Sequence, residues 1–283
     1  MYPTPIEKYG AGTRTGYNIA LWVVLLIWLL PLLAVMLTSI RSLEDISSGN
    51  YWGWPTDFLL IENYTEIFRA TPLGRYLLNS VMITIPTVIG VLVLSTLAGF
   101  ALAIYKIRLG FFVFAMFIAG NFIPFQILMI PVKDLTEFLG MYDTMPGLIM
   151  FHIAFQSGFA VLFMRNFIKA LPHELIEAAR VEGANEFQIF WYVVVPLVRP
   201  AIAAMAVLVF TFIWNDYFWA IVLVQSDNAQ PITAGIQSLR GQWVASWQLI
   251  SAGSVVAALP PVIMFFLMQR HFIAGLTMGA TKG

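Results

Sequence analysis

Long apolar runs separated by short polar segments make up most of this chain. Six runs reach the roughly 20 residues that a helix needs to cross about 30 Å of hydrocarbon. They span residues 19–40, 77–104, 110–131, 144–164, 201–224 and 250–268, and the only charged residue inside them is Asp216. The runs do not alternate between apolar and polar positions, as the strands of a membrane barrel would. The pattern predicts an all-α polytopic membrane protein with six transmembrane helices.

Composition supports this class and removes several kinds of chemistry. Hydrophobic residues make up 60% of the chain and the mean hydropathy is +0.82, well above an ordinary globular domain. There is no cysteine, and His152, His173 and His271 are far apart in the sequence. We therefore expect no disulfide, no metal site, no cofactor and no catalytic residues. The first run has 22 uncharged residues, which is too long for the apolar part of a signal peptide, so we expect a retained helix.

The charged residues predict which side of the membrane each segment faces. With six spans, segments 1–18, 105–109, 165–200 and 269–283 share one side, and 41–76, 132–143 and 225–249 share the other. The first side holds 10 of the 15 Lys and Arg residues, so the positive-inside rule makes it cytoplasmic. We expect a cytoplasmic N-terminus (1–18), a six-helix transmembrane domain (19–268) that includes the cytoplasmic loop 165–200, and a cytoplasmic tail (269–283).

The longest cytoplasmic segment contains the sequence ELIEAARVEGANEFQIFWYVVVPL, residues 174–197. Pro172 suits the first turn of a helix, and Gly183 suits the position just past the last turn. Asn185 is followed three residues later by Gln188, which is close to a capping box. The pattern predicts a helix from about residue 172, a sharp turn, and a second short helix rich in aromatic residues.

The charge of this segment indicates what it contacts. Residues 174–190 hold four Glu and one Arg. An amphipathic hairpin lying on the lipid headgroups would explain the aromatic residues. Such helices usually direct Lys and Arg toward anionic lipid, however, so the acidity favours a protein partner instead.

The spacing within this segment resembles a known motif. Glu177-Ala178-Ala179 is followed after three residues by Gly183, and after nine more by Val193-x-Val195-Pro196. This resembles the EAA loop of binding-protein-dependent ABC transporter permeases, whose pattern is EAA, three residues, G, nine residues, I-x-L-P; valine replaces Ile and Leu here. The remaining similarities indicate the carbohydrate-uptake class and its MalG-like subunits, and they are Asn79-Ser80, Pro124-x-Gln126, Ile130-Pro131, Trp214-Asn215-Asp216, Leu259-Pro260 and the tail from Gly275.

The resemblance implies a type I ABC importer permease fold in a bacterial or archaeal cytoplasmic (inner) membrane. It implies that the partners of this chain are a second, MalF-like permease subunit, a cytoplasmic ABC ATPase dimer, a periplasmic or tethered solute-binding protein, a sugar substrate and membrane lipid, with no nucleic acid. The chain has no G-x-x-x-x-G-K-[ST] motif, so a separate subunit must hydrolyse ATP. Residues 172–190 would be the coupling helix. The residues that the resemblance assigns to this coupling are Glu174, Glu177, Ala178, Ala179, Arg180, Gly183 and Pro196.

Asp216 has two interpretations. It is the sixteenth of 24 residues in its run, and an ionisable residue at that depth usually faces a water-filled cavity or a partner. Alternatively, the span ends early and Asp216 reaches the outer water. The resemblance assigns Trp214, Asn215 and Asp216 to the translocation pathway. For the polar residues His152 and Gln156 we expect hydrogen bonds between helices rather than contact with a substrate.

Two other classes of membrane protein fit less well. A secondary, ion-coupled transporter typically shows inverted repeats and paired intramembrane ionisable residues, whereas this sequence has no clear repeat and one such acid. A polytopic membrane enzyme would need convergent acid, base or metal ligands. Loss of transport on removal of the ATPase partner is the observation that separates these classes. The sequence does not distinguish a monosaccharide, an oligosaccharide, a polyol or a glycerol phosphate as the substrate.

Overall fold

The computed structural model describes residues 8–108, 110–121, 123–239 and 246–280, and every regular element in these ranges is helical. The chain divides into two compact units, which we describe separately. One unit comprises residues 1–71 and 239–256, and the other comprises residues 72–238 and 257–283. The helical fold confirms the predicted fold class.

The first unit begins with a long apolar helix. This helix, α1 (Ala11–Ser39), is followed by the short α2 (Leu43–Ser47) and by α3 (Leu60–Ala70). The most apolar part of α1 contains no buried residue. Because so many apolar side chains are stable only in an apolar environment, we expect lipid or another subunit to cover α1.

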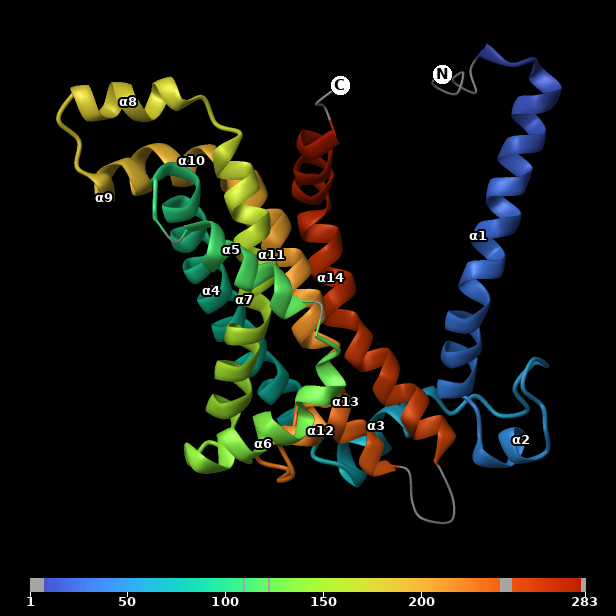
Figure 1. The fold of residues 1–283 in the computed structure, drawn as a ribbon. Helices are drawn as coiled ribbons and strands as arrows, with labels where there is room; N and C mark the ends of the chain where they lie inside the picture. Colours follow the sequence, from blue (N-terminus) through green and yellow to red (C-terminus); the bar gives the residue numbers. More distant parts are fainter. Residues whose placement is uncertain (1–7, 109, 122, 240–245, 281–283) are drawn as a thin grey trace. The chain divides into compact units, whose positions relative to one another are not determined.

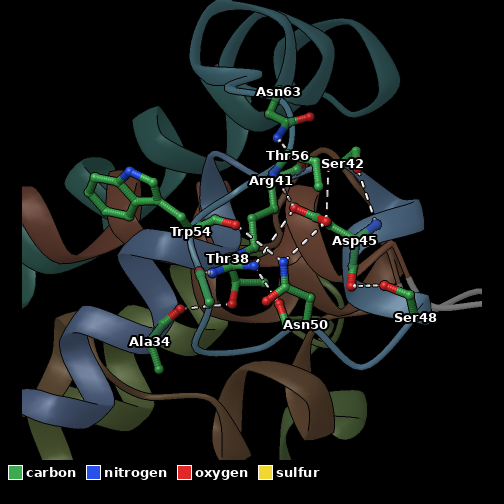
Figure 2. A network of polar contacts seen from close by, with 11 residues as sticks. Ala34, Thr38, Arg41, Ser42, Asp45, Ser48, Asn50, Trp54, Thr56 and Asn63 are labelled. Atoms are coloured by element: carbon green, nitrogen blue, oxygen red, sulfur yellow. Dashed lines mark hydrogen bonds and ion pairs between the residues drawn. The ribbon is translucent and has the colours of Figure 1, made fainter.

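The segment between α1 and α3 folds around a buried arginine (Figure 2). The guanidinium group of Arg41 is fully buried, donates a hydrogen bond to the carbonyl of Asn50, and lies 3.7 Å from the carboxylate of Asp45. The backbone N–H of Thr56 donates to the same carboxylate at 2.9 Å, and Asn63 donates to the carbonyl of Arg41 at 2.8 Å. A buried charge is tolerated only when it is paired in this way. The segment between α1 and α3 is therefore folded around its own polar contacts.

The second unit contains a bundle made of α4 (Leu73–Ile104), α7 (Met145–Lys169) and α11 (Arg199–Trp214). Its core includes Ile83, Leu148 and Val209, one from each of these helices. Helices α4 and α7 approach closely at Gly99, where a Cβ atom would lie 2.9 Å from the backbone nitrogen of Arg165. A small residue at this position is thus required for the packing.

Short elements lie at the two ends of this bundle (Figure 1). One end carries a helical hairpin, which we call the α8–α10 hairpin: α8 (His173–Val181), α9 (Glu186–Gln188), a π-helical turn (Ile189–Val194) and α10 (Val195–Leu197). The opposite end carries α6 (Met129–Phe138), α12 (Phe218–Leu223) and α13 (Ile232–Gly235). The remaining elements are α5 (Gly110–Asn121), two 3₁₀ turns (Phe125–Leu128 and Ile236–Leu239), and α14 (Trp247–Ala280).

Two of the six predicted runs are not continuous helices. The run 110–131 divides into α5, a 3₁₀ turn and the start of α6, and Pro124, which lacks a backbone N–H, precedes the turn. The run 201–224 is interrupted at residues 215–217. Within the described ranges, four helices are long and apolar enough to cross a membrane, and the bent pair Glu186–Leu197 and Arg199–Trp214 would make a fifth. The count of six spans therefore stays a prediction.

Candidate functional site

The first helix of the α8–α10 hairpin forms close to where the sequence predicts it. Pro172 is the N-cap residue, so α8 starts at His173, one residue later than expected. Glu174 lies in the first turn and Arg180 in the last. Both charges oppose the helix dipole at their own end, which stabilises this short helix.

The turn of the hairpin is a Schellman motif centred on Gly183. Gly183 has a φ of +86°, its N–H donates to the carbonyl of Arg180 at 3.0 Å, and the N–H of Ala184 donates to the carbonyl of Ala179 at 3.0 Å. Asn185 and Gln188 then form a complete capping box, with both hydrogen bonds at 2.9 Å. The predicted helix end and the predicted cap are both confirmed.

The two alanines of the motif have different environments. Ala179 packs beside the buried Ile176 against the cluster that contains Ile189. Ala178 is exposed, as are Val181 (86%) and Phe187 (71%). The sequence patterns placed Phe187 among the aromatic residues of the second short helix and did not single out Val181.

Arg180 joins the two arms of the hairpin through ion pairs. Its guanidinium group lies 2.7 Å from the carboxylate of Glu177 and 3.0 Å from that of Glu186. Glu186 also accepts a hydrogen bond from the hydroxyl of Tyr105, the residue that ends α4. These contacts tie both arms to the end of a bundle helix. The role of Tyr105 was not predicted, and its only sequence signal is its place next to a span.

These contacts shift two acid–base equilibria. The pKa of Tyr105 is raised to about 12, first because its hydroxyl is partly desolvated and then because it donates to Glu186. The pKa of Glu186 is lowered, first by the hydrogen bond from Tyr105 and then by Arg180. Both shifts favour the observed pairing of a protonated phenol with an ionised carboxylate.

The hairpin leads into α11 through a wide turn and a sharp bend. The N–H of Val195 donates to the carbonyl of Phe190, five residues earlier, and Pro196, which has no N–H, follows immediately. The segment Glu186–Leu197 meets α11 at 75°. The second arm of the hairpin is thus directly continuous with a bundle helix.

At the other end of α11, Asp216 lies in the interruption before α12. Its carboxylate accepts hydrogen bonds from the backbone N–H groups of Trp219 (3.3 Å) and Ala220 (3.0 Å), and lies 3.5 Å from Nε2 of His152 on α7. Its side chain is only 14% exposed. The helix does end early, as one interpretation required, but the carboxylate is packed against α7 and α12 and is not in open water.

The other two predicted pathway residues, Trp214 and Asn215, differ in burial. Trp214 is buried, and its indole N–H donates to the carbonyl of Ala257 at 3.0 Å, so its position fits a structural role. Asn215 is exposed, and its amide donates to the carbonyl of Thr211 at 2.8 Å. Of the three, Asn215 and Asp216 line a common pocket.

This pocket, which we call the α7–α11 pocket, has a volume of about 640 Å³. Its polar lining includes His152 and Gln156, for which the sequence predicted only hydrogen bonds between helices. The missed signal is their spacing, because residues four apart on a helix share one face. Seven aromatic residues complete the walls: Phe125, Phe155, Phe159, Phe212, Tyr217, Phe218 and Trp219.

In the part of the chain that the structure describes, no group of three or more His, Cys, Asp or Glu residues could hold a metal ion.

The chain as a whole resembles known transport proteins. Residues 11–277 match the family model described as the inner membrane component of binding-protein-dependent transport systems. The chain belongs to this family. It is an ABC transporter permease, and the predicted family is confirmed.

Some relatives of this permease are named as sugar transport subunits. It is 35% identical to the arabinooligosaccharides transport system permease protein AraQ of Halalkalibacterium halodurans, over 89% of this chain and 91% of that protein. It is 32% identical to the melibiose/raffinose/stachyose import permease protein MelC of Bacillus subtilis, over 90% of this chain and 91% of that one.

The fold of the permease is also that of a solved transporter. A chain from the crystal structure of a bacterial ABC transporter involved in the import of the acidic polysaccharide alginate superposes with a TM-score of 0.80, at 24% identity, over 95% of this chain and 100% of that chain. At this identity the likeness shows the fold alone. The relatives named above are likewise transport permease subunits.

Proposed function

We propose that this chain is a transmembrane permease subunit of an ATP-driven importer that moves a sugar or sugar derivative. A solute-binding protein would deliver the substrate, a second, MalF-like permease subunit would complete the pathway, and a cytoplasmic ABC ATPase dimer would supply the energy. The names of the relatives AraQ and MelC support the sugar class. No observation favours the alternative of a secondary, ion-coupled transporter.

The observation that carries the proposal is the surface of the α8–α10 hairpin. Glu177, whose side chain is 65% exposed, projects from the same short helix as Ala178 and the exposed Val181. The combination of acidic and small apolar groups suits a protein cleft and not anionic lipid. We assign this surface to contact with the ATPase.

The contacts within the hairpin support a role in transmitting motion. Arg180 and the Gly183 turn join the arms, Tyr105 links them to α4, and the second arm continues into α11 beyond Pro196. When ATP closes the ATPase dimer, a pull on α8 would therefore reach α4 and α11 together. In this proposal, movement of α11 opens the pathway outward.

At the far end of α11 the proposed pathway passes the α7–α11 pocket. Asn215 and Asp216 line it and are the side chains we assign to the substrate path. Trp214 would hold this end of α11 in place through the hydrogen bond from its indole N–H to the carbonyl of Ala257. We propose the inner-membrane orientation that the charges predict, with both termini in the cytoplasm, which places the hairpin on the ATPase side.

Reconstitution of the complete transporter in proteoliposomes tests the proposal. The permease is co-purified with its co-encoded permease, ATPase and binding protein, and the binding protein is first screened calorimetrically against sugars. We expect accumulation of the bound sugar that requires both ATP and the binding protein. Accumulation driven by an ion gradient without ATP would overturn the proposal in favour of a secondary transporter.

A further inference from the structure

The described lining of the α7–α11 pocket contains an acidic side chain without a basic one of the lysine or arginine type. Among the described residues that line this pocket, Asp216 is the only acid, and none is a lysine or an arginine. The two backbone N–H groups of α12 that bond to its carboxylate hold it in place at the pocket wall. An anion entering this partly enclosed space approaches the Asp216 carboxylate, with no lysine or arginine among the described lining residues to attract it.

The pocket also contains a buried polar atom that lacks a partner. His152 is 3% exposed and lines the pocket, its Nε2 lies 3.5 Å from Asp216, and its Nδ1 has no hydrogen-bond partner among the described residues. A buried nitrogen without a hydrogen-bond partner costs free energy. A hydroxyl group is a suitable partner because it both donates and accepts hydrogen bonds.

We propose that the α7–α11 pocket is a substrate-binding subsite for an uncharged sugar, and that Asp216 makes it exclude sugars that carry carboxylate, sulfate or phosphate groups. The polar groups of Gln156, Asn215 and Asp216 would bind hydroxyl groups, and the seven aromatic side chains would pack against the apolar faces of sugar rings. The volume of about 640 Å³ is within the usual range for a small-molecule site and exceeds that of one sugar ring.

This inference rests on the proposed function as a sugar permease, but it is tested without transport. The chain contains no cysteine, so an Asn215→Cys variant carries a single thiol in the pocket. In the assembled transporter, with labelling followed on this chain by mass spectrometry, the thiol is reacted with a negatively charged (sulfonate) or a positively charged (trimethylammonium) methanethiosulfonate. The ratio of the two rates, corrected for their ratio with a free thiol, measures the local potential.

We expect the cationic reagent to be favoured by about tenfold or more. The Asp216→Asn substitution in the same background should bring the ratio back toward that of the free thiol, and His152→Gln should leave the preference in place, because the carboxylate remains. A ratio near that of the free thiol, or a preference for the sulfonate, would overturn the charge assignment. A Gln156→Cys variant repeats the measurement if Asn215→Cys does not assemble.

Protection of the same thiol tests the binding part. Raffinose and an arabino-oligosaccharide, two compounds of the kinds named for relatives, serve as uncharged probes, and a trigalacturonate serves as the anion. We expect at least one uncharged probe to slow labelling severalfold and the trigalacturonate to have no effect. Protection by the trigalacturonate, or by none of the three, would overturn the subsite. Failure of ATP-driven uptake alone would instead count against the proposed function.

Discussion

The two polar regions of the bundle unit stabilise their charges in different ways. In the α8–α10 hairpin, Arg180 and its carboxylate partners are on the surface and pair through side chains. In the α7–α11 pocket, Asp216 is nearly buried and pairs with backbone N–H groups and with His152. Exposed ion pairs contribute about 0–1 kcal/mol, whereas buried polar groups need their partners.

Because the charges are stabilised differently, substitutions in the two regions should affect folding and transport differently. Substitutions in the hairpin change a surface that a partner would read and leave the fold nearly intact. Substitutions in the pocket change both a local structure and the groups that a substrate would meet. The following predictions test that separation, from the largest expected effect to the smallest.

Replacing the pocket carboxylate should have the largest effect on transport. Asp216→Ala removes the acceptor for two backbone N–H groups of α12, a loss of about 1 kcal/mol by analogy with a helix cap. We therefore expect normal assembly with uptake reduced more than tenfold, measured in proteoliposomes. Asp216→Asn keeps one side-chain oxygen as an acceptor and is the matched control for assembly. Unchanged uptake in Asp216→Ala would remove the pocket from the pathway.

A bulky residue at the turn of the hairpin should separate ATP hydrolysis from uptake. Gly183 has a φ of +86°, with open space around the position of a Cβ atom. Gly183→Val should cost roughly 1–2 kcal/mol locally because a branched residue disfavours this conformation. We expect insertion to be intact, uptake to fall severalfold and ATPase activity to persist.

Gly140 provides the control for backbone strain. It has a φ of +66°, it also has open space around it, and it follows α6 at the opposite end of the bundle. Gly140→Val introduces the same kind of strain and should leave the ratio of ATP hydrolysis to uptake unchanged. Equal uncoupling by the two variants would mean that strain anywhere in the bundle is enough.

Charge reversal on the exposed face should also uncouple the transporter, with a smaller effect. Glu177→Lys reverses a charge that is 65% exposed and pairs with Arg180. We expect uptake to fall several-fold while insertion and assembly are unaffected. Glu177→Gln removes the pair with Arg180 without reversing the charge, and Arg180 keeps its pair with Glu186. Equal uncoupling by Glu177→Gln would mean that the pair acts within the hairpin; stronger uncoupling by Glu177→Lys supports contact with a partner.

Removal of the hydrogen bond that links the hairpin to α4 should have the smallest effect on uptake. Tyr105→Phe removes the hydrogen bond to Glu186, which is worth about 1 kcal/mol. We expect amide hydrogen exchange in α9 to become roughly fivefold faster, with little change in uptake. Tyr192→Phe is the control, since Tyr192 is 78% exposed on the adjacent helical turn. Equal changes in the two variants would contradict the link.

The same link predicts a dependence on pH. The folded state lowers the pKa of Glu186. The contribution of Glu186 to the stability of the hairpin is therefore fully present above its unfolded-state pKa of about 4.3, and it is lost as the pH falls through its folded-state pKa. Hydrogen exchange of α9, corrected for intrinsic rates, should thus rise below about pH 4 in the wild type. Glu186→Gln should abolish this extra rise.

Local patterns predicted the hairpin better than they predicted the pocket. The turn at Gly183 and the capping box at Asn185 are determined by residues a few positions apart, so the sequence contains the necessary information. The pocket depends on His152 and Asp216, which are distant in sequence and meet only through packing of α7 against α11 and α12. A break such as that before Phe218 arises because Asp216 satisfies the N–H groups of a new helix, an effect that hydropathy does not detect.

The most direct test of coupling is a cross-link between the hairpin and the ATPase. Because the chain has no cysteine, Ala178→Cys places a single thiol on the exposed face of α8, while Ile176→Cys places one in the hairpin core. We predict that a short thiol–amine cross-linker joins Ala178→Cys to the ATPase subunit, with a yield that changes when ATP is added, and that Ile176→Cys gives far less product. A fully assembled transporter in which Ala178→Cys forms no ATPase cross-link, with or without ATP, would contradict the coupling role.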